Sequence, residues 1–403
     1  MRVTTSFLGG RLKEAMQYRG MGITDLARAV DGISKQSISL YVRGDNKPSY
    51  ENIEKMARIL DMPVGFFTNA DDRVLETDNI YFRSQSTASK KQRISQSIKV
   101  DYVGKIYKCL SKYVDFPKLN LPNSIEIIDD GDIFTYITDE GYEQLEKLAT
   151  ELRELWKLGN SPIVNMQYLL ESNGIIVTGF KDVDARIDAF SKRIRFVDDM
   201  DSVQPLYIIA VALGSKSQQR LKFDMAHELG HLLLHSFELE TELMSKEEFN
   251  AMEKQANTFA SVFLLPKDSF GKDVALYPTK LQYYLQLKKK WGVSIQAMLY
   301  RARQLDIISS YQYQYMMRQI SKNGWRKSEP ADIVGELYEN IFQGAIDAIV
   351  NSEYMDSNEL RQEFAHCGVL LNIRDLENIL SLREGTFKET DISQQRVKLR
   401  LIK

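Results

Sequence analysis

Five consecutive residues near the middle of the chain, His227-Glu228-Leu229-Gly230-His231, have the types and spacing of a zinc site. On a helix, side chains four residues apart lie on one face, so both imidazoles can reach one ion while Glu228 points at its open position. A catalytic zinc takes three protein ligands and leaves a fourth position for water. The motif therefore predicts Zn²⁺ on His227 and His231, with Glu228 as the general base that deprotonates the water.

The third ligand must come from another part of the chain. His235 lies eight residues past His227, about 12 Å along a helix axis, so we expect it to hydrogen-bond beside the ligands and not to bind the ion. Glu253 is the preferred third ligand because a capping signal at Ser245 opens a second helix there. Asn257 follows Glu253 by one turn, where it can orient a ligand histidine. Spacing alone leaves three rivals for the ligand role: Glu240, Glu247 and Glu248.

The sequence around this motif resembles the signature of the ImmA/IrrE family of metallopeptidases. The stretches that carry the resemblance include Arg220–His235, Glu253–Ala260 and Leu264–Pro266. The similarity extends from about residue 82 to residue 329. It implies a zincin-like fold in which Glu253 is the third ligand and Glu228 is the catalytic base. It also implies cleavage of transcriptional repressors that control stress, mobile-element or defence genes.

The first seventy residues resemble a lambda-repressor-like (XRE/Cro-type) helix-turn-helix domain. Short helices are expected over residues 8–18, 23–30, 34–43 and 50–60, with a fifth after Pro63. In such a domain the helix that begins at Ser34 lies in the major groove. Base edges are then the predicted contacts of Lys35, Gln36 and Ser37, and phosphates those of Ser39, Arg43 and Lys47. A five-helix module that binds proteins is the alternative.

Composition excludes several other classes of protein. The 403 residues carry a formal net charge of −2, so contact with nucleic acid must come from a local basic face. The two cysteines, Cys109 and Cys367, form no C-x-x-C pair, which argues against a disulfide scaffold and against thiolate metal ligands. Neither a signal peptide nor a long apolar run is visible, so we expect a cytoplasmic protein that does not enter a membrane.

The spacing of apolar residues predicts an α+β, mostly helical chain. Helices are expected over residues 142–158 and 165–172, and strands over 175–180 and 204–213, followed by the histidine-bearing helix with Ser215 as its cap. A further strand is expected near 369–373. The predicted segments are a helix-turn-helix domain (1–70), a linker (71–99), a zincin-like domain (100–275), a helical, helix-turn-helix-like extension (276–331) and a helical C-terminal region (332–403).

Together these features predict a DNA-binding regulator that is also a zinc metalloendopeptidase. Its expected partners are double-stranded DNA, bound through residues 1–70, and a repressor as the protein substrate, with a homodimer left open. The substrate is expected to add as a strand to a sheet edge near Ile187–Phe196. Two alternatives stay open: a transcription factor whose zincin-like domain is a non-proteolytic sensor, and an antitoxin-like interaction protein.

Overall fold

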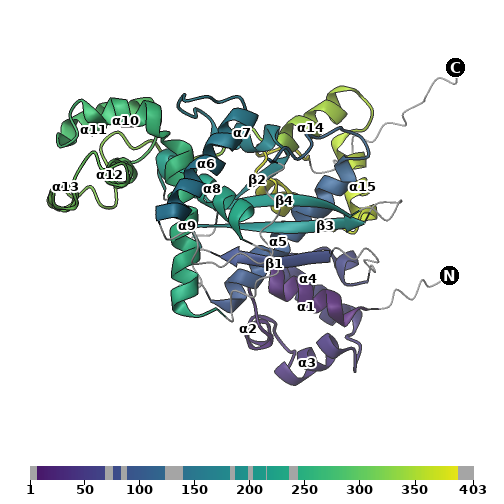
Figure 1. The fold of residues 1–403 in the computed structure, drawn as a ribbon. Coiled ribbons are helices and arrows are strands. Elements are labelled where there is room, and N and C mark those ends of the chain that lie inside the picture. The colour runs from purple at the N-terminus through teal and green to yellow at the C-terminus, as the bar shows by residue number, and fades with distance from the viewer. Residues whose placement is uncertain are drawn as a thin grey trace, which may run out of the picture. The chain divides into compact units, whose positions relative to one another are not determined.

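The structure is a computed structural model that describes residues 7–68, 76–82, 89–122, 139–181, 187–197, 203–214, 216–235 and 244–388. The chain divides into two compact units. The first unit comprises residues 1–74, 105–115 and 342–403, and the second comprises residues 75–104 and 116–341. Helices dominate both units and one mixed sheet lies in the second, so the predicted α+β, mostly helical class is confirmed (Figure 1). No helix in the described ranges is long and apolar enough to cross a bilayer.

The N-terminal helices of the first unit form the predicted helix-turn-helix arrangement. They are α1 (Gly9–Tyr18), α2 (Ile23–Ala29), α3 (Lys35–Arg43), α4 (Tyr50–Leu60) and the 3-10 helix η1 (Val64–Phe67). The predicted fifth helix is therefore a single 3-10 turn. The Ser34 hydroxyl caps α3 by accepting a hydrogen bond from the Ser37 amide at 3.0 Å. Gly44 ends α3 with a φ of 79°, a left-handed conformation that glycine adopts without steric cost.

Three C-terminal helices belong to the same unit: α14 (Ile341–Asn351), of which all but Ile341 lies in this unit, α15 (Ser357–His366) and α16 (Ile373–Ile379). The guanidinium of Arg19, the residue that follows α1, holds the Asp375 carboxylate with hydrogen bonds of 2.5 and 2.9 Å. The side-chain nitrogen Nδ2 of Asn372 donates to the backbone carbonyl oxygen of Asp61 at 3.0 Å. The C-terminal region thus packs on the N-terminal helices of this unit.

The strand predicted near residues 369–373 is wrong. Val369 and Leu371 are buried, which explains the apolar pattern, but they lie in a connection without regular structure. Asn372 caps α16 by accepting a hydrogen bond from the Asp375 amide at 2.7 Å. A short apolar run is ambiguous in sequence, and here the capping residue that follows it starts a helix.

The second unit is built around a four-stranded sheet in the order β1 (Glu76–Phe82), β3 (Ala189–Val197), β4 (Val203–Ala212) and β2 (Ile175–Phe180). β2 is parallel to β4, and the other two pairs are antiparallel. Its helices are α6 (Asp139–Leu155), α7 (Met166–Ser172), α8 (Gln218–Leu234), α9 (Lys246–Leu264), α10 (Lys267–Ala275), α11 (Leu281–Trp291), α12 (Ile295–Gln304) and α13 (Ser310–Lys322). α5 (Lys90–Leu110) has residues in both units. α8 contacts β3, β4 and α9.

β1 changes the expected position of the sheet edge. The segment around it was predicted to be a linker, yet it pairs with β3, with Tyr81 opposite Ser191 and Phe82 opposite Phe190. β3 therefore has neighbours on both sides, and the predicted free edge at 187–196 is wrong. The polar start of β1, Glu76-Thr77-Asp78-Asn79, hid the strand, because an edge strand tolerates polar residues that a central strand does not.

The predicted cap of the histidine-bearing helix also differs. α8 begins at Gln218, and its cap is Ser217, whose hydroxyl accepts a hydrogen bond from the Arg220 amide at 3.3 Å. Ser215 lies outside the described residues. The capping box predicted at Ser245 is present at the start of α9.

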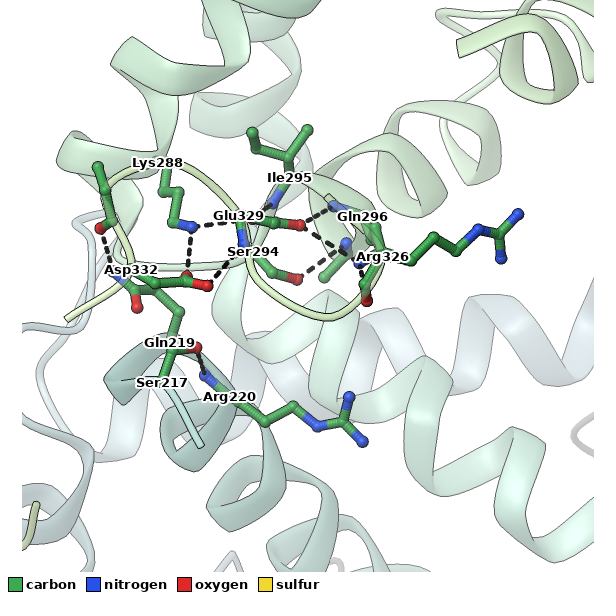
Figure 2. A network of polar contacts seen from close by, with 12 residues as sticks. Ser217, Gln219, Arg220, Lys288, Ser294, Ile295, Gln296, Arg326, Glu329 and Asp332 are labelled. Carbon is green, nitrogen blue, oxygen red and sulfur yellow. Dashed lines mark hydrogen bonds and ion pairs between the residues drawn. The ribbon is translucent and has the colours of Figure 1, made fainter. Parts of the chain in front are cut away.

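The segment between α13 and α14 (residues 323–340) holds the starts of α8 and α12. Lys288 lies between two carboxylates, 2.9 Å from Glu329 and 2.6 Å from Asp332 (Figure 2). Glu329 also accepts hydrogen bonds from the first backbone amides of α12, Ile295 at 2.8 Å and Gln296 at 3.1 Å. Further along, the Gln218 amide donates to the Ile333 carbonyl oxygen at 2.8 Å. A buried ion pair thus anchors the segment that holds the beginning of α8.

We expect Lys288→Ala to lower the free energy of unfolding by about 3 kcal/mol, because it leaves the buried Glu329 carboxylate without its cation. The neighbouring exposed Lys289 is the matched control, and Lys289→Ala should change stability by less than about 0.5 kcal/mol. Urea unfolding of both variants beside the wild type measures the difference. Equal midpoints for the two variants would contradict this role for the ion pair.

Candidate metal centre

A glycine sets the distance between the two helices that form the centre. A Cβ atom placed on Gly230 of α8 would lie 3.1 Å from Cδ1 of Phe259 and 3.2 Å from Cα of Ala256, both on α9. Real Cβ contacts are seldom this close, so a side chain at Gly230 would push α9 away. The absence of a side chain allows the backbones to approach and brings Glu253 of α9 to the histidines of α8.

Three side chains converge between these helices. His227 Nε2 lies 3.5 Å from Glu253 Oε2, and His231 Nε2 lies 3.3 Å from Glu253 Oε1. The two Nε2 atoms are 3.0 Å apart. Both imidazoles are buried, whereas 16% of the Glu253 side chain is exposed, so the centre is open to solvent on the carboxylate side. The three ligand atoms lie within 4.8 Å of one another and could hold a metal ion.

The hydrogen bonds of Asn257 fix the tautomer of His227. The Asn257 amide nitrogen donates to the carbonyl oxygen of Glu253 at 2.7 Å, so its side-chain oxygen faces His227 Nδ1 at 3.2 Å. Because that oxygen can only accept, His227 donates from Nδ1. In the neutral imidazole the lone pair is then on Nε2, the atom that faces His231 and Glu253. A metal ligand with its other nitrogen held in this way suits a divalent cation.

A parallel chain of contacts orients His231. Its Nδ1 lies 3.0 Å from Nδ1 of His235, and Nε2 of His235 lies 2.7 Å from the side-chain oxygen of Gln255. Burial, followed by electrostatic repulsion between the two rings when both are protonated, lowers the pKa of His235 to about 3, so this ring is neutral at physiological pH. If Nε2 of His235 donates to Gln255, its Nδ1 must accept from His231. The lone pair of His231 is then on Nε2.

Glu228 lies beside the two histidines on the same helix and is fully buried. The hydroxyl of Ser191 on β3 donates to Oε2 of Glu228 at 2.9 Å. The motif singled out Glu228, but no role was predicted for Ser191 or for Gln255. Ser191 approaches from β3, 37 residues before Glu228, and Gln255 reaches His235 from α9, so spacing within the histidine motif carried no signal for either.

The electrostatics of Glu253 favour its charged form. Burial alone would raise the pKa of this carboxyl group, but its contacts with His227 and His231 outweigh burial and hold the pKa well below its usual range. Among the rival carboxylates, Glu248 accepts a hydrogen bond from the Ser245 amide at 2.8 Å as part of the helix cap. Glu247 is exposed, and Glu240 lies outside the described residues. Of these four glutamates, Glu253 is thus the one that the structure places at the histidines.

The six residues predicted to contact DNA lie on or just after α3, in the order Lys35, Gln36, Ser37, Ser39, Arg43 and Lys47. All except the two half-buried serines are exposed. The hydroxyl of Ser37 lies 2.9 Å from that of Ser34 at the cap, and Arg43 forms an exposed ion pair of 3.0 Å with Asp45. The outer face of α3 is therefore accessible within its unit.

Comparison with known families agrees with both parts of this description. A peptidase family model, described as the IrrE N-terminal-like domain, matches the segment that contains β3, β4, α8 and α9. Residues 186–303 are similar to the IrrE N-terminal-like domain. We refer to them as the IrrE-like domain. A helix-turn-helix family model matches residues 12–67. The two resemblances inferred from sequence motifs are thereby confirmed.

The chain has no match among curated proteins. Among solved structures, a Mycobacterium tuberculosis transcriptional regulator is similar at 18% identity with a TM-score of 0.29. The alignment covers 45% of this chain and 52% of that one, so the chain spans about half the length of this relative.

We expect Asn257→Ala to weaken binding of a divalent cation about 10- to 100-fold, because His227 loses the acceptor that fixes its tautomer. Asn257→Asp keeps an oxygen in this place and should retain most of the affinity. Competition with a chelator of known affinity measures both. The control is Asn250→Ala, an exposed position on α9. A cation affinity that is the same for Asn257→Ala and Asn250→Ala would rule out this function of Asn257.

Proposed function

We propose that this chain is a zinc-dependent endopeptidase that also acts as a DNA-binding regulator and cleaves a transcriptional repressor. The helix-turn-helix and IrrE-like domains support the coarser description, a DNA-binding regulator with a peptidase-type domain. One observation carries the finer proposal: His227, His231 and Glu253 converge beside the buried carboxylate of Glu228.

Zinc is the ion that suits this set of side chains. Two imidazole nitrogens and one carboxylate are a common ligand set for catalytic zinc, with room for one further ligand. Neither cysteine belongs to the cluster, so no thiolate closes the site. When bound, zinc would lower the pKa of a coordinated water and polarise a peptide carbonyl. Asn257 and His235 would hold the two imidazoles in the orientation that binding requires.

Glu228 would carry out the proton transfers of peptide hydrolysis. Its carboxylate takes one proton from the attacking water as the oxygen bonds to the carbonyl carbon. It then gives that proton to the amide nitrogen, which leaves as an amine when the carbon–nitrogen bond breaks. Ser191 donates to one oxygen of Glu228, which would orient the carboxylate for these proton transfers. The buried position of Glu228 keeps bulk water from competing for the proton.

The helix-turn-helix domain would bring this activity to an operator or to a repressor bound there. Lys35, Gln36 and Ser37 stand at the start of α3, the end that reads base edges in this type of domain. Ser39, Arg43 and Lys47 would contact phosphates, which position the domain without specifying sequence. A transcriptional repressor bound near such an operator is the substrate that we propose.

Glu228→Gln tests the proposal. We expect this variant to bind one zinc ion per chain, as the wild type does, but to cleave repressors from adjacent genes about 10²- to 10⁴-fold more slowly. Purified repressors are incubated with each protein and the fragments are resolved by mass spectrometry, while zinc is measured by elemental analysis.

Glu247→Gln, an exposed position with the same change of charge, is the control and should cleave like the wild type. Undiminished cleavage by Glu228→Gln would refute the assignment of the base. Operator binding that depends on zinc, with no cleavage of any repressor, would favour the sensor alternative.

A further inference from the structure

The helices after the metal centre carry a strong local excess of positive charge. Residues 267–327, which span α10 to α13, contain twelve lysine and arginine residues and three aspartates, a net charge of +9 in a chain whose total is −2. Ten of the twelve basic residues are exposed. The two buried ones are neutralised, Lys288 by Glu329 and Asp332, and Arg301 by Glu146 at 2.6 Å. Of the exposed ones, Lys290 pairs with Asp273 at 2.6 Å, and the charge of the others is available to a polyanion.

One face of α13 concentrates this character. Tyr311, Tyr315, Arg318 and Lys322 follow one another at intervals of four, three and four residues, which places them in a stripe along one side of the helix. All four are exposed, and the tyrosines strongly so, at 73% and 53%. The opposite side of α13 is buried through Met316 and Ile320. The stripe is thus an outer face and not part of the core.

The charge around this face is of one sign. No aspartate or glutamate occurs from residue 307 to residue 328, whereas four basic residues do. A solvated surface helix usually mixes both signs, and a helix dipole explains a single lysine in the last turn but not a stripe that begins with two exposed tyrosines. Lysine, arginine and tyrosine are among the side chains that contact phosphate oxygens of DNA.

The helix pair before α13, α11 and α12, does not provide a second recognition helix. α11 and α12 are joined by a short turn in which Gly292 has a φ of 60°, as in a helix-turn-helix. However, the amides at the start of α12 donate to the Glu329 carboxylate (Figure 2), and Ile295, Met298 and Leu299 are buried. The start of α12 therefore cannot enter a groove, and any contact with DNA must come from the outer faces.

We propose that the outer face of α13, formed by Tyr311, Tyr315, Arg318 and Lys322, is a second DNA-contact surface. It binds the phosphate backbone of duplex DNA and reads no bases. The two basic side chains pair with phosphates, and the tyrosine hydroxyls donate to phosphate oxygens. This surface is separate from the helix-turn-helix domain and from the peptidase centre, so it adds a nucleic-acid contact to the peptidase-bearing unit itself.

The test uses the full-length protein with the helix-turn-helix face disabled by Lys35→Glu and Arg43→Glu. Binding of a random-sequence duplex is followed by fluorescence anisotropy across a series of salt concentrations. In this background, adding Arg318→Glu and Lys322→Glu should lower the affinity about tenfold or more at low salt and reduce the slope of log K against log salt by about 2, since each phosphate contact contributes about 0.9. Tyr311→Ala with Tyr315→Ala should lower affinity and leave the slope unchanged.

Lys147→Glu with Lys246→Glu is the matched control, because both positions are exposed and the net charge changes equally. It should keep the slope within the error of the measurement, and Arg318→Lys with Lys322→Arg should restore binding. Thermal unfolding by circular dichroism must give the same midpoint for all variants. An equal loss in the control would overturn the proposal by assigning binding to net charge. The proposal would also be overturned if Arg318→Glu with Lys322→Glu weakened binding to phosphatidylserine vesicles and left duplex binding unchanged.

Discussion

The close approach of α8 and α9 is the constraint on which the candidate centre depends. A helix places two histidines on one face by itself, but the third donor needs a second helix whose backbone comes nearly into contact with the first. Gly230 makes this possible, because any side chain there would meet Phe259 and the backbone of Ala256. The glycine inside the motif is therefore as much a part of the site as the residues that face it.

Two sets of hydrogen bonds orient the ligand histidines around this contact. Asn257 lies one turn beyond Glu253 on α9 and ties the carbonyl of that residue to the ring of His227. His235, the residue that follows α8, lies four positions after His231 and connects it to Gln255. Each helix thus orients a ring through a residue four positions from a ligand. The start of α8 is held in turn by the segment that Lys288 anchors.

The sequence predicted most features that lie within one helix or at its ends, although the cap of α8 is Ser217 and not Ser215. The spacing of His227 and His231, the cap at Ser245 and the helices of the DNA-binding domain all follow from local pattern. Features that need tertiary contacts were missed: Ser191 reaches Glu228 only through the position of β3, and β1 is a polar strand that its pairing with β3 stabilises. The same pairing removes the sheet edge that was expected to receive a substrate. At 369–373 a strand was predicted where none forms, because the apolar residues of a buried connection have the same sequence pattern as a strand.

The proposed function assigns catalysis to one unit and DNA contacts to both. The C-terminal helices pack on the DNA-binding helices through Arg19 and Asp375, which leaves the outer face of α3 exposed. The peptidase-bearing unit has its own basic face on α13. A regulator that binds DNA through more than one surface can hold a protease where its repressor substrate binds. This would raise the local concentration of the repressor around the peptidase centre.

The most direct measurement is X-ray absorption at the zinc K edge of the purified protein. Two imidazole nitrogens and carboxylate or water oxygens at about 2.0–2.2 Å are the ligands that the account predicts. In His231→Ala the imidazole scattering should fall to that of one ring, or bound zinc should be lost altogether. Sulfur at about 2.3 Å, or zinc whose ligands do not change in the His231→Ala variant, would contradict it.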